Sequence, residues 1–249
     1  MLFVIFVWAA IKKMVVSTSQ KHSLYTLAKC LGINMIKQQY GLNDFEITER
    51  EPCFKGFFKL DRFHFRHKRF DGSWSRSVGR EIFVRGDATC VLPYDPVERS
   101  VVLVEQFRIG AVPLSNEAMV EKTSPWLIEL VAGINEEGEK PEDVARRESV
   151  EEANLTLGEL VPICQYLASP GGTNEKVHLF CAQVDSRNAG GVFGLAEEDE
   201  DIRVHVVSFD AAMLMIESGQ INNAAAIIAL QWLALNRERI EQAWLKTAE

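Results

Sequence analysis

The sequence lacks the features that mark several broad classes of protein. Its five cysteines are scattered over 249 residues, and none forms a Cys-x-x-Cys pair. This argues against both a disulfide framework and a zinc site. The chain also has no internal repeats and no low-complexity tracts, which excludes a repeat array. Reduced thiols are the simplest account of the cysteines, so we expect a cytoplasmic protein.

Long hydrophobic runs are also missing. The apolar run over residues 1–11 ends at Lys12-Lys13 and is too short for a bilayer, which needs about 20 apolar residues. No basic region precedes it and no clear cleavage site follows it. We therefore expect no stable membrane association. We interpret residues 1–40 as an N-terminal extension of uncertain status, with Met14 or Met35 as the working start. A peripheral membrane or packing role is the alternative.

Positive charge is in deficit, with 27 basic against 35 acidic residues and a net charge of −8. This balance argues against nucleic acid as a general partner. An anionic small substrate remains compatible, because a bound metal can invert the local field. The segment 57–70 mixes aromatic and basic residues, so it allows a nucleic-acid interpretation. A half-solvated hairpin is the simpler one, since Asp71-Gly72 follows.

What is present indicates a globular chain of one large or two modest domains. Alternation with period 2 over 74–84 predicts a strand, and 88–93 and 101–108 read as buried strands. We expect an exposed loop over 111–124. The other expected elements are strands near 126–132, 160–166, 177–184 and 202–207, a helix from Pro141, and helices over 210–218 and 223–244.

The expected helix from Pro141 carries three carboxylates within five residues, at Glu148, Glu151 and Glu152. One helical residue turns about 100°, so Glu148 and Glu152 share a face, and like charges at that spacing destabilise an isolated helix. Arg147 can reach Glu151, but no basic residue follows Glu148 or Glu152 one turn on. A hard divalent cation would compensate them. A solvated face with ion pairs is the alternative.

The flanking residues favour the cation. An apolar strand over 126–132 runs straight into Gly133, and Pro141 suits a first helical position. Asn154 follows the last carboxylate, where a left-handed helix stop favours Gly or Asn. The segment thus forms one short unit of strand, loop and acidic helix, ended by the Asn154 cap. Such a unit would direct several carboxylates toward one site.

This stretch resembles the Nudix box, a spaced pattern of glycine, glutamate and arginine residues. Ser149 replaces the usual aliphatic residue, and Asn154 replaces the closing glycine. We expect Ser149 to loosen the packing under the helix slightly. The positions that fall in register are Gly133, Glu139, Arg147, Glu148, Glu151, Glu152 and Leu155.

From about residue 41 to 244 the chain is similar to the ADP-ribose pyrophosphatase branch of the Nudix family in bacteria. Pro170, about fifteen residues past the box, is a mark of that branch. The resemblance implies an α+β fold, a Nudix α/β/α sandwich with a mixed sheet over 87–249 with C-terminal helices. A small antiparallel β domain over 41–86 would precede it, exchanged between the subunits of a homodimer. The other landmarks are Gly56-Phe57-Phe58 and the segments 80–86, 105–108, 167–173 and 194–205.

The resemblance also implies roles for individual residues. Glu198 matches the general base, while Glu139 and Arg147 look structural. Glu151 is either a third metal ligand or a partner for Arg147. The implied metal ligands are the Ala132 carbonyl, Glu148, Glu152 and Glu200. The implied substrate contacts are Arg85, Arg108, Ser169 and Glu175, with Phe57, Arg80 and Glu81 lining the partner subunit's site.

The activity implied is Mg²⁺-dependent hydrolysis of ADP-ribose to AMP and ribose 5-phosphate, with two or three Mg²⁺ ions or Mn²⁺ as a substitute. Another nucleoside diphosphate sugar, such as ADP-glucose, is the nearest alternative substrate. A non-catalytic ADP-ribose sensor is the alternative from another class. Intact Arg147-Glu148 and Glu151-Glu152 pairs and the lack of a winged-helix segment disfavour it.

Overall fold

The computed structural model describes residues 32–34, 36–113, 124–195 and 199–246. The described residues fall into two compact units, one within Met1–Glu49 and His64–Gly79 and the other within Arg50–Phe63 and Arg80–Glu249. Within these residues, no helix combines the length and the apolar character that crossing a membrane requires. The expected extension over 1–40 and loop over 111–124 lie mostly outside the described residues.

A small three-stranded sheet comes first along the chain. It consists of β1 (Phe45–Lys55), β2 (Lys59–His67) and β3 (Val78–Val84) in that order. The expected hairpin at Asp71-Gly72 is confirmed: Gly72 has φ +86° and Lys68 forms an antiparallel bridge with Trp74. The expected strand from Trp74 is wrong in its start, because pairing lapses after that bridge and resumes only at Val78.

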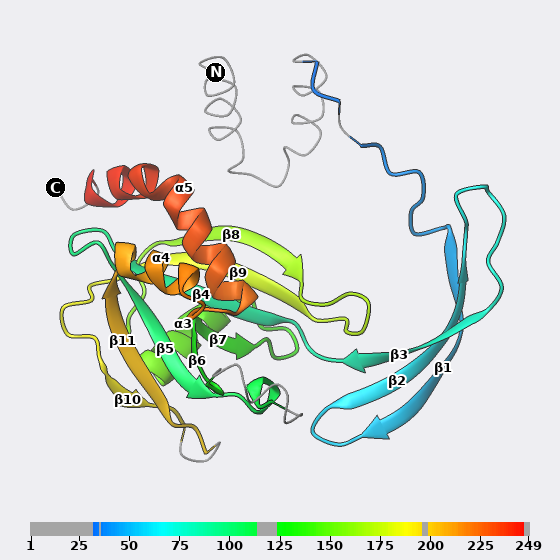
Figure 1. The fold of residues 1–249 in the computed structure, drawn as a ribbon, viewed down its shortest axis with the longest axis horizontal. Coiled ribbons are helices and arrows are strands. Elements are labelled where there is room, and N and C mark those ends of the chain that lie inside the picture. The colour runs from blue at the N-terminus through cyan, green and yellow to red at the C-terminus, as the bar shows by residue number, and fades with distance from the viewer. Residues whose placement is uncertain (1–31, 35, 114–123, 196–198, 247–249) are drawn as a thin grey trace. The chain divides into compact units, whose positions relative to one another are not determined.

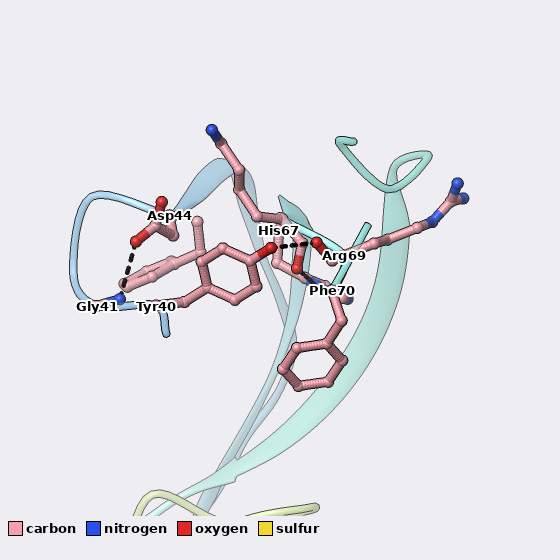
Figure 2. Close-up of a pocket in the computed structure, with 8 residues that line it drawn as sticks. Tyr40, Gly41, Asp44, His67, Arg69 and Phe70 are labelled. Atoms are coloured by element: carbon pink, nitrogen blue, oxygen red, sulfur yellow. Dashed lines mark hydrogen bonds between the residues drawn. The ribbon is translucent and has the colours of Figure 1, made fainter. Parts of the chain in front are cut away.

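A cavity of about 460 Å³ lies beside this hairpin turn. The hydroxyl of Tyr40 donates to the carbonyl oxygen of Arg69 at 2.5 Å, and the Gly41 amide donates to Asp44 at 2.9 Å (Figure 2). The guanidinium of Arg69 extends away from the Tyr40 ring (Figure 2). The cavity is lined by Tyr40, Gly41, Asp44, Phe45, His67, Lys68, Arg69 and Phe70.

The second sheet has eight strands and is mixed. Its main path runs β10-β11-β5-β4-β9-β8, in which β4 pairs with β9 in parallel and the other neighbouring strands are antiparallel. The strands are β4 (Ala88–Asp95), β5 (Ser100–Phe107), β6 (Trp126–Glu129), β7 (Val131–Ile134), β8 (Leu160–Leu167), β9 (Lys176–Gln183), β10 (Gly191–Phe193) and β11 (Ile202–Ser208). A short 3₁₀ turn, η2 (Ile109–Ala111), follows β5.

This sheet splits between β4 and β5. The two strands pair only next to their turn, at Tyr94↔Val101 and Asp95↔Ser100. Farther on, β7 pairs with β4 and β6 pairs with β5. The single strand expected over 126–132 is therefore wrong: the segment divides at Leu130 and serves two different partners. The loop that follows β7 at Ile134 consequently leaves from the edge of the split.

Helices cover both faces of the mixed sheet. On one face α4 (Phe209–Glu217) and α5 (Ala224–Lys246) form a core with the sheet (Figure 1). On the other, α3 (Pro141–Ala153) packs through Ala145 and Ala153. Successive strand residues point to opposite faces, so Val91 and Leu92 enter different cores. The expected α+β sandwich with a preceding small sheet is confirmed. The short, glycine-flanked β10 was not expected.

Candidate metal and pyrophosphate site

Helix α3 begins and ends where the sequence predicts. Pro141 occupies its first turn, and Asn154 adopts the left-handed conformation at φ 50° and ψ 40°. The Leu155 amide donates to the Ser149 carbonyl at 2.8 Å, which closes the helix end. Ser149 is fully buried, and its hydroxyl donates to the Ala145 carbonyl at 2.8 Å. The unusual serine therefore has a hydrogen-bond partner inside the helix.

Arg147 ties the preceding loop to the helix. Its guanidinium donates to both oxygens of Glu139 at 3.1 and 3.3 Å. Its Nη1 atom also donates to Glu151 at 3.0 Å, as expected, and to Glu148 at 2.6 Å. Glu148 is therefore compensated by the residue before it, which the one-turn spacing argument missed. Hydrogen bonding to Arg147 lowers the pKa of Glu139, and the reciprocal bonds raise the pKa of Arg147.

Glu152 is the most deeply buried carboxylate of the helix. Only 3% of its surface is exposed, and its Oε2 accepts the Ala132 amide at 3.0 Å. Burial raises its pKa to about 8, and the charges of Glu148 and Glu200 add to that rise. Burial likewise raises the pKa of Glu148 to about 7, although Arg147 opposes the shift. The fold thus concentrates negative charge where solvent cannot stabilise it.

Two glycines allow the acidic side chains to approach the loops. A Cβ atom on Gly133 would lie 1.7 Å from Oε1 of Glu148, so only glycine leaves room for that carboxylate. Gly194 has φ +116°, and a Cβ atom there would lie 2.6 Å from the Cβ of Glu200. The Leu195 amide donates to Oε2 of Glu200 at 3.1 Å. Glu200 is thereby held by residues of its own loop.

The structure places Glu200 near enough to Glu148 and Glu152 for its charge to raise the pKa of both. Their oxygen atoms do not all lie within 4.8 Å of one another, which fits the engagement of Glu148 by Arg147. The Ala132 amide faces this group through its bond to Glu152. Glu198 lies outside the described residues. The metal-ligand roles stay predictions, and so does the choice between the two roles of Glu151, which contacts Arg147.

The residues expected to contact substrate lie in two pairs and several exposed positions. Arg85 pairs with Glu175 at 3.3 Å and stacks over the Phe58 ring at 5.1 Å. Arg108 pairs with Glu129 at 2.8 Å. Ser169 accepts the Gly172 and Thr173 amides through its carbonyl. Glu81 pairs with Arg62 at 2.9 Å, Arg80 is exposed, and 90% of the Phe57 surface is exposed.

Glu129 is the residue that the motif analysis missed. It lies in β6, with 17% of its side chain exposed, and accepts from Arg108. Its signal in the sequence was a charged residue inside the apolar run Trp126-Leu-Ile-Glu-Leu-Val. A charge placed in a half-buried strand generally has a partner, and here that partner is an expected substrate contact.

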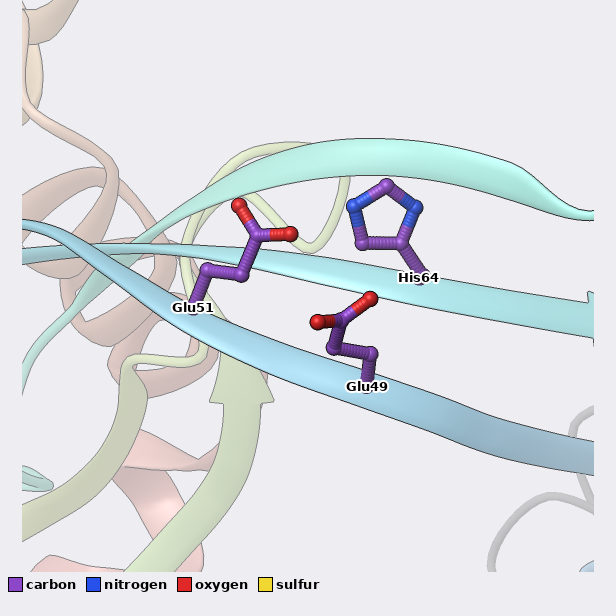
Figure 3. A group of neighbouring side chains, drawn as sticks. All are labelled: Glu49, Glu51 and His64. Atoms are coloured by element: carbon purple, nitrogen blue, oxygen red, sulfur yellow. The ribbon is translucent and has the colours of Figure 1, made fainter.

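A second group of titratable side chains lies in the small sheet. Glu49 and His64 extend from the neighbouring strands β1 and β2 (Figure 3). Arg66 and Glu46 form an ion pair on the same two strands at 2.5 Å. Exposed charges on paired strands commonly stabilise the pairing through cross-strand contacts, and we assign this group no further role.

The raised pKa values predict a pH dependence of cation binding. The folded chain holds protons on Glu148 and Glu152 up to about pH 7 and 8, whereas ordinary carboxyls release them near 4.5. Without a cation, the free energy of unfolding should therefore fall as pH rises through that window. A cation needs the charged form, so Mg²⁺ should raise the melting temperature more at about pH 8.5 than at about pH 6.

Differential scanning fluorimetry with and without Mg²⁺ at both pH values measures this difference. Glu152→Gln is the matched control, because it removes the more strongly shifted group and should reduce the pH dependence. An equal Mg²⁺ effect at the two pH values in the unmodified protein would contradict the assignment of these carboxylates as ligands.

The fold and this site together define the class of protein. A mixed sheet lies between helices, and a loop followed by an acidic helix begins where the sheet divides. The model of the NUDIX domain matches residues 84–230. The chain belongs to the NUDIX domain family.

Individual relatives narrow the comparison. The ADP-ribose pyrophosphatase of Escherichia coli (strain K12) is 50% identical over 205 residues, covering 82% of this chain and 95% of that protein. The enzyme of the same name from Haemophilus influenzae is 47% identical over 212 residues, covering 84% and 95%. The GDP-mannose pyrophosphatase of Pectobacterium atrosepticum is 33% identical over 189 residues, covering 75% and 92%.

Among solved structures, one described as an ADP compounds hydrolase has a TM-score of 0.57 at 18% identity. The match covers 84% of this chain and 98% of that one. At this identity the likeness supports the shared fold alone.

Proposed function

We propose that this chain hydrolyses the pyrophosphate bond of ADP-ribose to AMP and ribose 5-phosphate. One observation carries the proposal: the buried carboxylate of Glu152 and the half-buried carboxylate of Glu148 lie on one helix of the matched NUDIX domain. That helix belongs to a chain 50% identical, over 82% of its length, to an ADP-ribose pyrophosphatase. The two arginines that pair with Glu175 and Glu129 supply cationic groups suited to phosphate oxygens.

The acidic group suits Mg²⁺, with Mn²⁺ as a possible substitute. Its donors are hard carboxylate oxygens, and their raised pKa values mark a site where negative charge is unfavourable without a cation. Glu148, Glu152, Glu200 and the Ala132 carbonyl would hold two or three ions, with Glu151 as a further candidate ligand. When bound, such ions neutralise pyrophosphate charge and lower the pKa of water.

In the proposed reaction, a water oxygen attacks one phosphorus of the pyrophosphate, and the bond from that phosphorus to the bridging oxygen breaks. The water proton passes to the carboxylate of Glu198, which we propose as general base. Arg85 and Arg108 would bind the phosphate oxygens of the substrate, and Glu175 and Ser169 would also contact it. AMP and ribose 5-phosphate leave as products.

A substrate panel at fixed Mg²⁺ concentration tests this proposal. ADP-ribose should give the highest kcat/KM, above ADP-glucose and GDP-mannose, with AMP as a product. Product analysis by mass spectrometry in ¹⁸O-labelled water then locates the attacked phosphorus. A preference for GDP-mannose, the substrate named for relatives at 33% identity, would replace the substrate assignment. No turnover of any nucleotide sugar would favour the non-catalytic sensor.

We further propose a cytoplasmic homodimer in which the small β domain over 41–86 is exchanged. The support is the end of β1 and the turn after it, where Phe54 and Phe57 are 63% and 90% exposed. Large exposed apolar side chains often mark interaction surfaces. Phe57, Arg80 and Glu81 would then line the site of the partner subunit.

Subunit mixing tests the exchange. Glu148→Gln and Arg80→Ala would each be inactive alone, but their mixed dimer should regain activity in one of its two sites. Light scattering should give twice the 28.1 kDa chain mass. Mixtures that stay inactive, although mass spectrometry detects the mixed dimer, would contradict a site built from both subunits.

A further inference from the structure

The loop between β8 and β9 lies beside the end of β3 (Figure 1) and forms hydrogen bonds with it. Phe83 and Thr173 form a single parallel bridge, in which the Phe83 amide donates to the Gly172 carbonyl at 2.8 Å. The Thr173 hydroxyl donates to the Phe83 carbonyl at 2.8 Å. The Arg85 amide donates to the side-chain oxygen of Asn174, also at 2.8 Å. Two side chains therefore extend a contact that the backbone begins.

These two side chains act on the residues next to them. β3 ends at Val84 and β4 begins at Ala88, so Arg85 lies between strands and Asn174 supplies the acceptor for its amide. The Thr173 hydroxyl also accepts the Glu175 amide at 3.2 Å. One side chain therefore fixes the backbone of Arg85, and the other fixes the backbone of Glu175.

The glycine turn of this loop makes few steric contacts. A Cβ atom added to Gly171 or Gly172 would meet nothing within 4 Å, so the glycine turn is open on that side. A chain with adjacent glycines loses much conformational entropy when it is ordered. Because steric contacts at the two glycines are few, hydrogen bonds order the turn: the backbone bonds to Ser169 and Phe83, and the side-chain bonds of Thr173 and Asn174.

Arg85 and Glu175, whose backbones these hydrogen bonds order, form an ion pair. Nη1 of Arg85 lies 3.3 Å from Oε1 of Glu175, whose side chain is 14% exposed. The other side of the Arg85 guanidinium stacks on Phe58, which in turn contacts the Phe83 ring at 4.8 Å. The guanidinium is thus set by Glu175 on one side and by Phe58 on another, and the backbones of both charged residues depend on the loop contacts.

We propose that Thr173 and Asn174 are positioning residues that set Arg85 and Glu175 for substrate binding. The inference rests on the proposed function, in which these two charged residues contact ADP-ribose. Neither Thr173 nor Asn174 needs to touch the substrate. Losing either contact should weaken binding and leave the chemical step unchanged, because the acidic helix α3 is held by separate contacts.

The test compares Asn174→Ala and Thr173→Val with the rescue variants Asn174→Asp and Thr173→Ser. The first pair should raise KM for ADP-ribose about tenfold, equivalent to about 1.4 kcal/mol, with kcat within about twofold of the unmodified protein. The second pair, which keeps the acceptor or the hydroxyl, should restore KM. Asn236→Ala is the matched control, because it too removes one side-chain hydrogen bond to the backbone, here the bond that the Asn236 amide group donates to the Trp232 carbonyl in α5.

Amide hydrogen exchange, measured without substrate, separates this inference from the proposed function. Asn174→Ala should speed exchange of the Arg85 amide at least tenfold, whereas Asn236→Ala should not. Unchanged exchange, unchanged KM, or a fall in kcat at constant KM would overturn the positioning role. If the unmodified protein does not hydrolyse ADP-ribose, the proposed function fails instead, and the exchange rates still decide whether Asn174 holds Arg85.

Discussion

Replacing Glu152 with glutamine is expected to abolish most hydrolysis while leaving the fold intact. Replacing a residue that hydrogen-bonds to a metal ligand lowers metal affinity or activity by about 10–100-fold. Removing a proposed direct ligand should therefore lower activity further. The fold should tolerate the change, because burial already raises the pKa of Glu152 to about 8 and favours its neutral form. Glutamine is neutral, similar in shape, and keeps an oxygen that can accept the Ala132 amide.

Two measurements separate these effects. The melting temperature without divalent cation should stay the same or rise in Glu152→Gln, whereas the stabilisation by added Mg²⁺ should largely disappear. Turnover of ADP-ribose at saturating Mg²⁺ gives the catalytic loss. Near-normal turnover would show that Glu152 is not a ligand, and a large fall in melting temperature would show that its role is structural.

Gly133→Ala is expected to displace Glu148 and to lower activity by about the 10–100-fold typical of a misplaced metal ligand. The new Cβ atom would lie 1.7 Å from Oε1, 2.1 Å from Cδ and 2.4 Å from Cγ of Glu148. A small rotation cannot relieve three such overlaps. The atoms that must move belong to a flexible side chain, so the carboxylate should shift while the backbone of β7 stays paired with β4.

Gly41→Ala is the matched control, because a Cβ atom at Gly41 would meet nothing within 4 Å. Isothermal titration with Mn²⁺ should detect weaker cation binding in Gly133→Ala, alongside the loss of turnover. Unchanged cation affinity in that variant would mean that the position of Glu148 against Gly133 has no part in binding.

Local features of the site could be predicted from the sequence because they depend on residues close in the chain. The helix start at Pro141, the left-handed stop at Asn154 and the Arg147–Glu151 pair all follow from spacings within one helix, and the structure confirms them. The α+β class was implied by the resemblance to the Nudix family, and the structure confirms it. The short β10 escaped prediction because three residues beside glycines carry little periodic signal.

The acidic helix and its limits follow from the sequence alone, because helix capping and side-chain spacing are local properties. The division of the preceding strand at Leu130 follows from the tertiary structure, in which its two parts pair with different strands. Only the tertiary structure paired Glu129 with Arg108 and Asn174 with the Arg85 amide. These contacts join residues 21 and 89 positions apart, and such distant partners are set by strand register, which no local pattern specifies.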